Sequence, residues 1–412
     1  MTGGRDPNAF FRGVDDTAGN LPPDGQAEPA AVPVLLDAGE TEPIPPRQWL
    51  LGTTFCRRFL SSLLSPGGTG KTALRIAQAM SLAAGRSLTG EYVHQRCRVL
   101  YVTLEDSMDE LRRRVRACRI HHGVDAAELS ERMYLWAPPR GCKIAERPAY
   151  ANGIVSGTLE AQLRSVIVEK GIDLVTIDPF VKSYGGDIDE NSNSAIDAVC
   201  DIITQLAIEL YFAADVTHHD SKGTRIAGDI DRGRGATAFR DAGRLGQSLT
   251  TMSAEEAKKF DISERDRRSL VRLDSAKVNL APAGEARWFQ LIGVALGNGN
   301  SDYPNGDIVQ TVEPWMPPDT WAGLSHPALN DVLTDIDAGM SNGQRYSAAK
   351  SADKRAAWRV VQKHFPEKNE QQCREVIGTW VRNAVLCSEQ YDDPIDRKAR
   401  AGLFLNQAKR PS

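Results

Sequence analysis

Residues 65–72 read Ser-Pro-Gly-Gly-Thr-Gly-Lys-Thr and separate a short apolar run from a helical pattern. Glycines in this arrangement let the backbone turn its N–H groups toward a phosphate, and Lys71 and Thr72 supply a cation and a hydroxyl. Ser65 stands where the pattern usually has its first glycine, and a purely structural glycine loop is the alternative. We expect a loop that binds ATP and Mg²⁺. The predicted nucleotide-binding residues are Pro66, Gly67, Gly68, Thr69, Gly70, Lys71, Thr72 and Ala73.

From residue 59 onward, short apolar runs alternate with helical patterns at the spacing of a parallel sheet with crossover helices. Beyond residue 268 the strand-like segments follow one another closely, which indicates an antiparallel extension at the sheet edge. We therefore predict an α/β core with a mostly parallel, twisted sheet. The predicted strands are 59–64, 98–104, 173–177, 211–217, 245–251, 269–273 and 287–296, and the predicted helices are 72–84, 108–121, 158–169 and 194–210.

Asp178 closes the apolar run 172–177, so a carboxylate lies at the carboxyl end of a buried strand. Open α/β sheets bind ligands at this edge. We interpret Asp178 as the acid that holds the water shell of Mg²⁺ beside Thr72. The alternative is an aspartate that caps the turn before Pro179.

Glu105 ends the neighbouring apolar run 99–104, and no carboxylate directly follows Asp178. A carboxylate at the end of an adjacent strand can orient the attacking water across the γ-phosphate. Glu105 is therefore the candidate catalytic base, and Lys71 the candidate catalytic cation. Alternatively, Glu105 and Asp106 complement the dipole of the next helix.

His218 and His219 end the strand at 211–217. Adjacent side chains on a strand point to opposite faces, so this pair is a poor zinc clamp. A polar residue here can instead sense the γ-phosphate and pass its state to the following loop. That loop carries glycines and three cations that suit the phosphate backbone of single-stranded DNA, although an ordinary mobile surface loop is the alternative. The predicted DNA-binding residues of the loop are Lys222, Arg225 and Arg232.

The two ends of the chain differ in charge. Residues 1–46 hold eight acids against two arginines and contain eight prolines, which predicts a disordered acidic tail. Residues 345–412 hold fourteen Lys and Arg against eight Asp and Glu, a balance suited to a polyanion or to a solvated helical surface. We expect an ATPase domain at 47–296, a linker at 297–327, which is rich in Gly, Asn, Asp and Pro, and a further domain at 328–412.

Two amphipathic helices followed by a basic hairpin predict a winged helix-turn-helix-like fold for residues 328–412. One helical face carries Trp358, Val361 and Phe365, and the next carries residues between Cys373 and Ala384. Contact with duplex DNA would use the second helix and the hairpin. The candidate DNA-binding residues there are Arg397, Lys398 and Arg400.

Composition excludes several protein classes. Hydrophobic residues make up 41% of the chain and charged residues 25%, and no run approaches the roughly 18 apolar residues that a membrane span needs. The first twenty residues lack the apolar core of a secretory signal, so we expect a cytoplasmic protein without a membrane partner. Seven cysteines without a C-x-x-C pair indicate reduced packing residues.

Seven segments follow one another along residues 48–296: SPGGTGKT, LYVTLED, LVTIDPF, VTHHDSKG, RGATAFRDAGR, LTTMSAEEAKKFDI and AKVNLAPAGEARWF. Together they resemble the RecA-type core of the RepA-like hexameric replicative helicases of broad-host-range plasmids. The resemblance implies a RecA-like P-loop NTPase that forms a homo-oligomeric ring, with ATP at subunit boundaries and single-stranded DNA in a central channel. It also implies that Arg244 reaches the γ-phosphate of the neighbour's ATP and that Lys277 lies nearby. Arg234 is a second candidate to act in trans.

The sequence thus predicts a Mg²⁺-dependent ATPase that assembles as a ring and moves on or remodels single-stranded DNA in plasmid, phage or mobile-element replication. We expect the ring to be a hexamer. The acidic tail and the added C-terminal domain do not belong to a minimal helicase and weaken the prediction of unwinding. One alternative is a recombinase-like or defence ATPase that binds DNA without unwinding it. Another is an ATP-gated regulator whose output is the winged helix.

Overall fold

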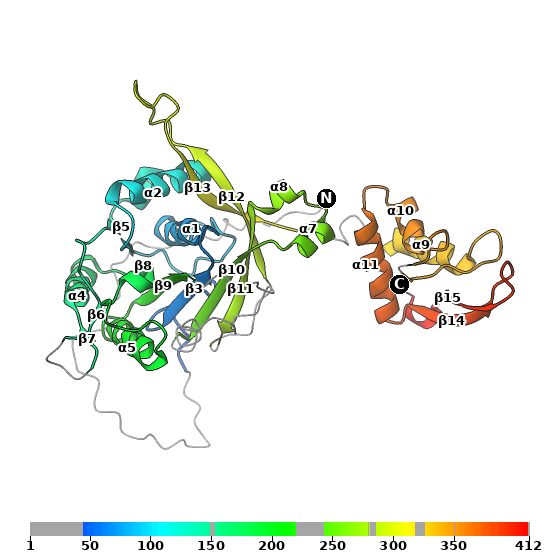
Figure 1. Cartoon of the computed structure of the whole chain (residues 1–412), viewed down its shortest axis with the longest axis horizontal. Coiled ribbons are helices and arrows are strands. Elements are labelled where there is room, and N and C mark those ends of the chain that lie inside the picture. The colour runs from blue at the N-terminus through cyan, green and yellow to red at the C-terminus, as the bar shows by residue number, and fades with distance from the viewer. Residues whose placement is uncertain are drawn as a thin grey trace, which may run out of the picture. The chain divides into compact units, whose positions relative to one another are not determined.

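The computed structural model of this chain describes residues 44–148, 153–219, 243–278, 280, 286–317, 326–349 and 351–410. The chain divides into two compact units (Figure 1). The first contains Met1–Thr251 and Ser269–Trp315, and the second contains Met252–Arg268 and Met316–Ser412. Each unit is described below by itself.

A nine-stranded sheet forms the centre of the first unit, in the order β13-β12-β11-β10-β3-β9-β8-β4-β5. The strands from β10 to β5 run parallel, whereas β11, β12 and β13 continue the sheet as antiparallel neighbours. The strand that leads into the P-loop is β3, and one strand, β9, separates it from the strand that ends at Asp178. The bounds are β3 Leu60–Ser65, β4 Val99–Thr103, β5 Met133–Trp136, β8 Leu174–Asp178, β9 Ala213–His219, β10 Leu245–Thr251, β11 Leu270–Val278, β12 Arg287–Ala295 and β13 Ile308–Trp315.

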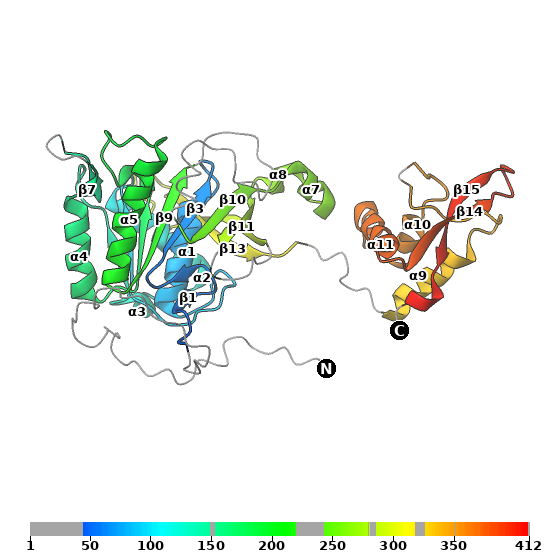
Figure 2. The same cartoon turned by 90° about the horizontal axis from the view of Figure 1, so that it is seen from below.

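Helices cover both faces of this sheet (Figures 1 and 2). On one face, α1 (Lys71–Ala84) and α2 (Met108–His122) pack on a core that extends from β4 to β13. On the other face, α4 (Thr158–Lys170) and α5 (Asn193–Glu209) pack on β3, β4, β8 and β9. Parallel strands covered on both faces read as continuous apolar runs, which is why the sequence locates them well. The α/β prediction is confirmed: the sheet is mostly parallel and continues into an antiparallel extension.

Shorter elements complete the first unit. Four of them are strands that form small two-stranded sheets, and one is a helical turn. Their bounds are β1 Trp49–Leu51, β2 Phe55–Cys56, β6 Ala145–Glu146, β7 Val155–Ser156 and α3 Ala126–Leu129.

The segment 297–327 is not simply the linker that its composition predicts, because it contains β13. Val312 is fully buried and pairs with Leu291 of β12, so the strand is part of the sheet. The β-branched residues of the run 308–312 explain the strand, and the Gly, Asn and Pro residues on either side hide it from a composition count. The antiparallel extension therefore has three strands rather than two.

A buried ion pair joins α1 to the centre of the sheet. Arg75 of α1 and Asp215 of β9 are both fully buried, and the Arg75 Nη2 to Asp215 Oδ1 distance is 2.8 Å. Burial raises the pKa of Asp215 to about 6, against the opposing effect of Arg75. Arg75 Nη1 also donates to Gln78 and Gln247, which links the P-loop helix to β10 as well. Removing one partner of such a pair leaves an uncompensated buried charge.

In the second unit, three helices precede an antiparallel hairpin. Trp358, Val361 and Phe365 of the second helix segment and Cys373, Val376, Ile377 and Trp380 of the third are buried in one core, as their helical spacing predicts. The sequence pattern did not identify the first of these helices. The bounds in this unit are α9 His326–Ala338, α10 Trp358–His364, α11 Glu370–Arg382, β14 Leu386–Asp392 and β15 Ala399–Leu405, with α7 Ala254–Phe260 and α8 Glu264–Arg267 from the earlier segment.

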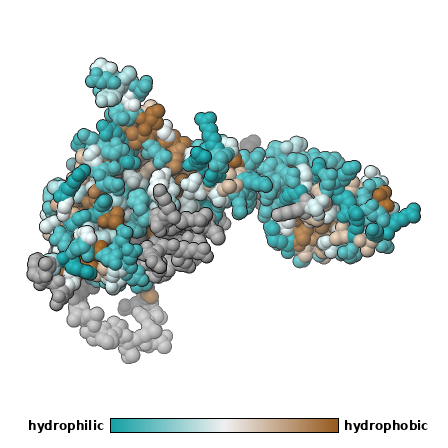
Figure 3. Space-filling view, in the orientation of Figure 1, coloured by the Kyte–Doolittle hydropathy of each residue, from teal (hydrophilic) through white to brown (hydrophobic). Residues whose placement is uncertain are grey.

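The surface visible in Figure 3 is mostly hydrophilic, with one apolar patch near α2 and β13 of the first unit. Ile120 of α2 and Ile308 of β13 are exposed large hydrophobic residues. Among the described residues, no helix is both long enough and apolar enough to cross a membrane.

Candidate nucleotide-binding site

The P-loop joins β3 to α1 and is held by its own hydroxyl groups. Ser65, fully buried at the end of β3, contacts the hydroxyl of Thr69 across the loop. Both hydroxyls also donate to the carbonyl oxygen of Pro66, at 2.8 Å each. A serine in the place of the usual first glycine therefore has a structural function, because its side chain closes the loop.

The start of α1 is open to an anion. Gly70 caps the helix with a φ of 88°, a left-handed conformation that suits glycine, and the cap makes no side-chain hydrogen bond. The first turn contains no acidic residue. The first N–H groups of a helix have no partner within the helix and lie at the positive end of its dipole. This arrangement can accept phosphate oxygens directly.

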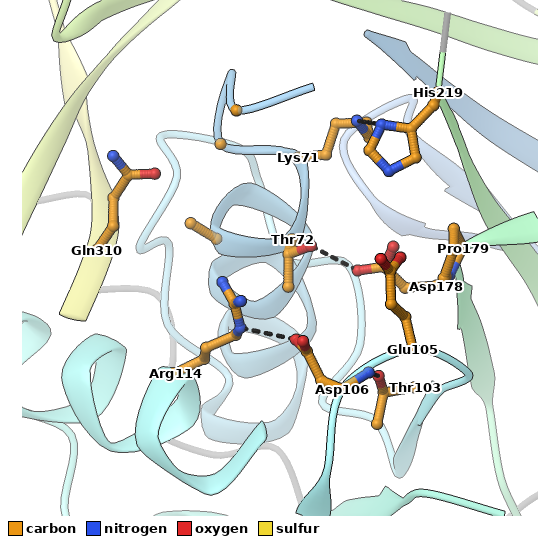
Figure 4. Close-up of a pocket in the computed structure, with 13 residues that line it drawn as sticks. Lys71, Thr72, Thr103, Glu105, Asp106, Arg114, Asp178, Pro179, His219 and Gln310 are labelled. Atoms are coloured by element: carbon orange, nitrogen blue, oxygen red, sulfur yellow. Dashed lines mark hydrogen bonds and ion pairs between the residues drawn. The ribbon is translucent and has the colours of Figure 1, made fainter. Parts of the chain in front are cut away.

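Gly68, Gly70, Lys71, Thr72 and Ala73 line a cavity of about 260 Å³ at the carboxyl edge of the parallel strands. The other lining residues lie on, or directly after, five further elements: β4, α2, β8, β9 and β13 (Figure 4). These residues are Thr103, Glu105, Asp106, Arg114, Asp178, Pro179, His219 and Gln310.

Lys71 lies between the P-loop and the end of β9. Its Nζ lies 3.3 Å from the carbonyl oxygen of Ser65 and 3.4 Å from that of Pro66, and 3.0 Å from Nδ1 of His219 (Figure 4). Burial lowers the pKa of Lys71 to about 8, although Asp178 and Glu105 oppose this shift. Burial and the charge of Lys71 also lower the pKa of His219. A neutral imidazole can accept a hydrogen bond from the ammonium group of Lys71.

Asp178 receives hydrogen bonds from three elements at the end of β8. Thr72 of α1 and Tyr101 of β4 each donate to Oδ2 at 2.7 Å, and Thr217 of β9 donates to Oδ1 at 2.5 Å. The carboxylate is buried, with 7% of its surface exposed. Three donors to one buried carboxylate fix its orientation.

A hydroxyl and a carboxylate in direct contact are oxygen ligands of the kind that Mg²⁺ prefers. Thr72 and Asp178 therefore fit a Mg²⁺ site in which Thr72 binds the ion and Asp178 orients its water shell. Mg²⁺ commonly uses one or two protein oxygens together with substrate phosphates. Among the described residues, no group of three or more His, Cys, Asp or Glu side chains could hold a metal ion.

Glu105 directly follows β4 and faces the same cavity as Lys71 and Asp178 (Figure 4). The backbone fixes its position, because the N–H of Leu104 donates to the carbonyl oxygen of Asp178 at 2.8 Å. The side chain is exposed, so water can reach the carboxylate. The sequence prediction that two adjacent strand ends place Asp178 and Glu105 together agrees with this geometry.

Five lining residues had no predicted role in this site: Thr103, Asp106, Arg114, Pro179 and Gln310. Arg114 of α2 forms an ion pair with Asp106, 2.9 Å from its Nε to Oδ2, and Thr103 accepts from the N–H of Asp106 at 3.1 Å. Gln310 of β13 enters from the opposite side of α1 (Figure 4). Arg114 lies one helical turn after Glu110, a spacing visible in the sequence, whereas no local signal marks Gln310.

The antiparallel extension also contacts the P-loop at Gly70. A Cβ atom on Gly70 would lie 2.5 Å from Cδ2 of Leu291 in β12 and 3.7 Å from Oε1 of Gln310. The absence of a side chain at Gly70 therefore allows both the left-handed backbone and this close approach.

The two histidines predicted as sensors lie in different places. His219 lines the nucleotide cavity, whereas His218 is mostly buried and its ring centre lies 6.1 Å from that of Phe180. Burial lowers the pKa of His218 to about 4. Only His219 therefore contacts Lys71, which agrees with the alternation of side chains along a strand.

Arg244 is exposed and directly precedes β10. Because β10 runs parallel to β3 and Leu245 pairs with Ser61, Arg244 lies near the edge of the sheet opposite to its own P-loop. Lys277 of β11 pairs with Gly246, so its backbone lies near the same end. Lys222, Arg225, Arg232 and Arg234 lie outside the described residues.

In the hairpin of the second unit, the candidate DNA-binding residues differ in their surroundings. Arg400 forms an ion pair with Asp396 at 2.5 Å, and its Nη1 lies 3.8 Å from Asp393. Arg397 and Lys398 lie at the turn between β14 and β15 and are exposed. The charge of Arg400 is therefore partly neutralised.

Two comparisons with known proteins found similarities to this chain. A family model described as an AAA domain matches residues 26–225, just under half of the 412 residues. The crystal structure of the RadB recombinase is similar at 14% sequence identity and a TM-score of 0.37, over 62% of this chain and 91% of that chain. The matched residues include the P-loop, Glu105 and Asp178, and the cavity that these residues line is that of a nucleotide-binding P-loop.

Proposed function

We propose that this protein is a Mg²⁺-dependent ATPase that assembles as a hexameric ring. The ring moves on or remodels single-stranded DNA in the replication of a plasmid, phage or mobile element. The observation that carries the ATPase is one cavity that holds Lys71, the Thr72 and Asp178 pair, and Glu105. Phosphoryl transfer needs a cation on the phosphates, a held Mg²⁺ and an oriented water. These three needs match the three groups.

In this mechanism the chain positions the nucleotide and the attacking water. The P-loop N–H groups and Lys71 hold the phosphates, and Mg²⁺, when bound, would supply further neutralisation of the phosphate charge. Thr72 and Asp178 hold the ion, and Glu105 accepts the proton of the attacking water. Tyr101 and Thr217 are positioning residues, because they act through the carboxylate of Asp178.

A ring is supported by the place of Arg244. The pairing of Leu245 with Ser61 puts Arg244 about five residues, or roughly 17 Å, behind the end of β3 along the sheet. This register keeps Arg244 away from the phosphates of its own chain, so any action on ATP must occur on another subunit. Such trans fingers contribute on the order of a thousandfold or more in rate.

Mixed rings test this action in trans. Arg244→Ala subunits retain a complete P-loop, and Lys71→Ala subunits retain the arginine, so a mixture contains interfaces with both intact parts. We expect ATP turnover to recover partly in the mixture while each variant alone stays inactive. Mixed rings that form, as native mass measurement shows, but that never recover turnover would contradict the proposal. In that case Arg234 and Lys277 are the next candidates.

The proposed link to DNA is the contact between Lys71 and His219. His219 ends β9, and the segment with Lys222, Arg225 and Arg232 follows it directly. A phosphate that draws Lys71 away from His219 would change the end of this strand, and the loop begins there. DNA on the loop and ATP at the P-loop would then influence each other reciprocally.

The decisive experiment measures ATP turnover with single-stranded DNA, with duplex DNA and without DNA. We expect single strands to stimulate turnover several-fold, and we expect Lys222→Ala with Arg225→Ala to remove the stimulation but keep the basal rate. A rate of ATP turnover that single-stranded DNA does not change would contradict the proposed motor function. A strand-displacement assay with and without ATP then separates a helicase from a recombinase-like or defence ATPase that only binds DNA.

A second candidate function, a nucleotide-gated regulator that binds duplex DNA, is favoured by the second unit. Three helices followed by the hairpin of β14 and β15 match the order of elements in a winged helix-turn-helix, and the exposed turn carries Arg397 and Lys398. This function predicts a duplex affinity that differs between the ATP and ADP states and falls steeply with salt. Arg397→Ala and Lys398→Ala should weaken it more than Arg400→Ala, because Arg400 is ion-paired.

A further inference from the structure

A second cavity, of about 380 Å³, adjoins the nucleotide cavity on the far side of Glu105. Glu105 lines both cavities, and it is the catalytic base in the proposed mechanism. The other charged residues of the second cavity are Arg140, Lys143 and Lys182. None of these three cations contacts the P-loop cavity, so the proposed hydrolysis does not use them.

The backbone holds the two lysines next to each other. The N–H of Ile144 donates to the carbonyl oxygen of Ser183 at 2.7 Å, and Ala145 forms a parallel bridge with Tyr184. Ile144 and Ala145 are buried in the core beneath the sheet. Residues 143 and 182 therefore precede two segments that are fixed side by side. Nζ of Lys143 also donates to the carbonyl oxygen of Lys182, at 2.6 Å.

A turn directs Arg140 toward the same cavity. The N–H of Cys142 donates to the carbonyl oxygen of Pro139 at 3.3 Å, which closes the turn around Arg140. Pro138 and Pro139 precede this turn, and proline restricts the backbone there before any ligand binds. The cation is thus presented by a short and restricted segment rather than by a long loop.

The charge of this cavity is not balanced. Within the part of the chain that the structure describes, no carboxylate forms an ion pair with Arg140, Lys143 or Lys182. Partial burial lowers the pKa of Lys143, and repulsion from Lys182 lowers it further. Glu146 lies near enough to Lys143 to oppose this lowering but does not line the cavity. Among the lining residues three cations face one carboxylate, that of Glu105, so an anion would gain from all three.

We propose that this cavity is a second anion site, which binds a phosphate group through Arg140, Lys143 and Lys182 and couples its occupancy to Glu105. A guanidinium and two ammonium groups are the side chains that recognise phosphate. The volume lies within the range of small-ligand sites and suits one phosphate with an attached sugar. The phosphate can belong to the backbone of a single-stranded nucleic acid or can be inorganic phosphate.

The coupling follows from the shared carboxylate and rests on the proposed ATPase, whereas the anion site itself does not. An occupied site places negative charge beside Glu105, which changes the position or the proton affinity of the base. By linkage, nucleotide in the first cavity must change the affinity of the second for phosphate by the same factor.

Labelling with pyridoxal phosphate tests the site without any need for ATP turnover. This reagent carries a phosphate and an aldehyde. The aldehyde condenses with a lysine amine, with loss of water, to an imine, and borohydride then reduces the imine to a stable secondary amine. The full chain is labelled for a short time, and peptide mass mapping reads each lysine separately. We expect Lys143 or Lys182 to react faster than the exposed Lys354. Equal rates at all three lysines would overturn the proposal.

Arg140→Ala sharpens this test, because Arg140 contributes charge but cannot itself be labelled. We expect the labelling rate at Lys143 and Lys182 to fall roughly two- to fivefold. Arg147→Ala is the matched control, since it removes an exposed arginine of the same segment that does not line the cavity. An equal rate in both variants would count against the site, since it would show that general surface charge attracts the reagent.

Protection separates the two sources of phosphate. An oligo(dT) of about twenty nucleotides and inorganic phosphate are compared at equal phosphate concentration. Protection by the oligonucleotide alone identifies a nucleic-acid backbone, and equal protection by both identifies free phosphate. Protection by neither would refute the anion site. If single-stranded DNA does not stimulate ATP turnover but labelling is still specific and protected, the proposed motor function is wrong and the proposed anion site is supported.

Discussion

The parallel and the antiparallel parts of the sheet contribute to the nucleotide cavity in different ways. The parallel strands β3, β4, β8 and β9 deliver the P-loop, Glu105, Asp178 and His219 from their carboxyl ends, which all meet at one edge. The antiparallel strands β12 and β13 have no common carboxyl edge, and they deliver Leu291 and Gln310 from within the strands. Chemistry thus resides in the parallel part, and the antiparallel part supplies a wall.

The largest expected effect belongs to the parallel part. Lys71→Ala removes the only P-loop cation, so we expect ATP turnover to fall about 100- to 1,000-fold. The fold should persist, because the hydroxyls of Ser65 and Thr69 close the loop without Lys71. Steady-state phosphate release measures turnover, and thermal unfolding checks the fold. An unfolded variant would show that the charge also stabilises the loop through Ser65, Pro66 and His219.

The contact between the two parts is tested at Gly70. Gly70→Ala brings a left-handed backbone cost of roughly 1–2 kcal/mol and, in addition, a clash with Leu291. We expect lower unfolding free energy and weaker ATP binding. The double variant Gly70→Ala with Leu291→Ala removes the clash and leaves the backbone cost.

A double-mutant cycle therefore measures the coupling free energy between positions 70 and 291. The double variant should lose less stability in urea unfolding than the sum of the two single variants. Strict additivity would mean that β12 does not press on the P-loop and that the two parts of the sheet act independently at this site.

The pH dependence of nucleotide binding follows from the pKa of Lys71, which burial lowers to about 8. Bound phosphates favour the charged lysine, so its pKa rises on binding. The contribution of Lys71 to affinity is complete below pH 8 and declines as the pH rises above it, by up to about tenfold per pH unit. Equilibrium binding of a non-hydrolysable ATP analogue between about pH 7 and about pH 9 measures this effect. Lys71→Arg, which stays charged, is the control and should bind with little dependence on pH.

The smallest expected effect belongs to Gln310, the residue with which the antiparallel part of the sheet lines the cavity. Gln310→Ala removes one polar group from a cavity whose phosphate-binding groups lie elsewhere, so we expect the KM for ATP to rise roughly two- to fivefold with kcat unchanged. A matched change in Gln290, which lies on β12 outside the cavity, should have no effect. A loss of kcat in Gln310→Ala would show that β13 takes part in the chemistry.

The same comparison explains how much the sequence predicted. Asp178 and Glu105 each end an apolar run, and the rule for parallel strands then places them together. Tyr101 and Thr217 lie inside strands, and their contacts with Asp178 depend on which strands are neighbours. The position of Gln310 in the cavity depends in addition on the register between β12 and β13, which the sequence pattern alone does not fix. Strand β13 was hidden inside a segment that its composition predicts to be a linker.

The most direct test of the central claim, that one edge of the parallel sheet is an ATP hydrolysis site with Glu105 as base, is a single-turnover measurement with Glu105→Gln. The amide keeps the shape of the side chain but cannot accept the proton of water. We predict ATP binding within a factor of about two of the wild type and a hydrolysis step slower by about 100- to 10,000-fold. Hydrolysis at the wild-type rate with the same affinity would contradict the account and would place the base elsewhere.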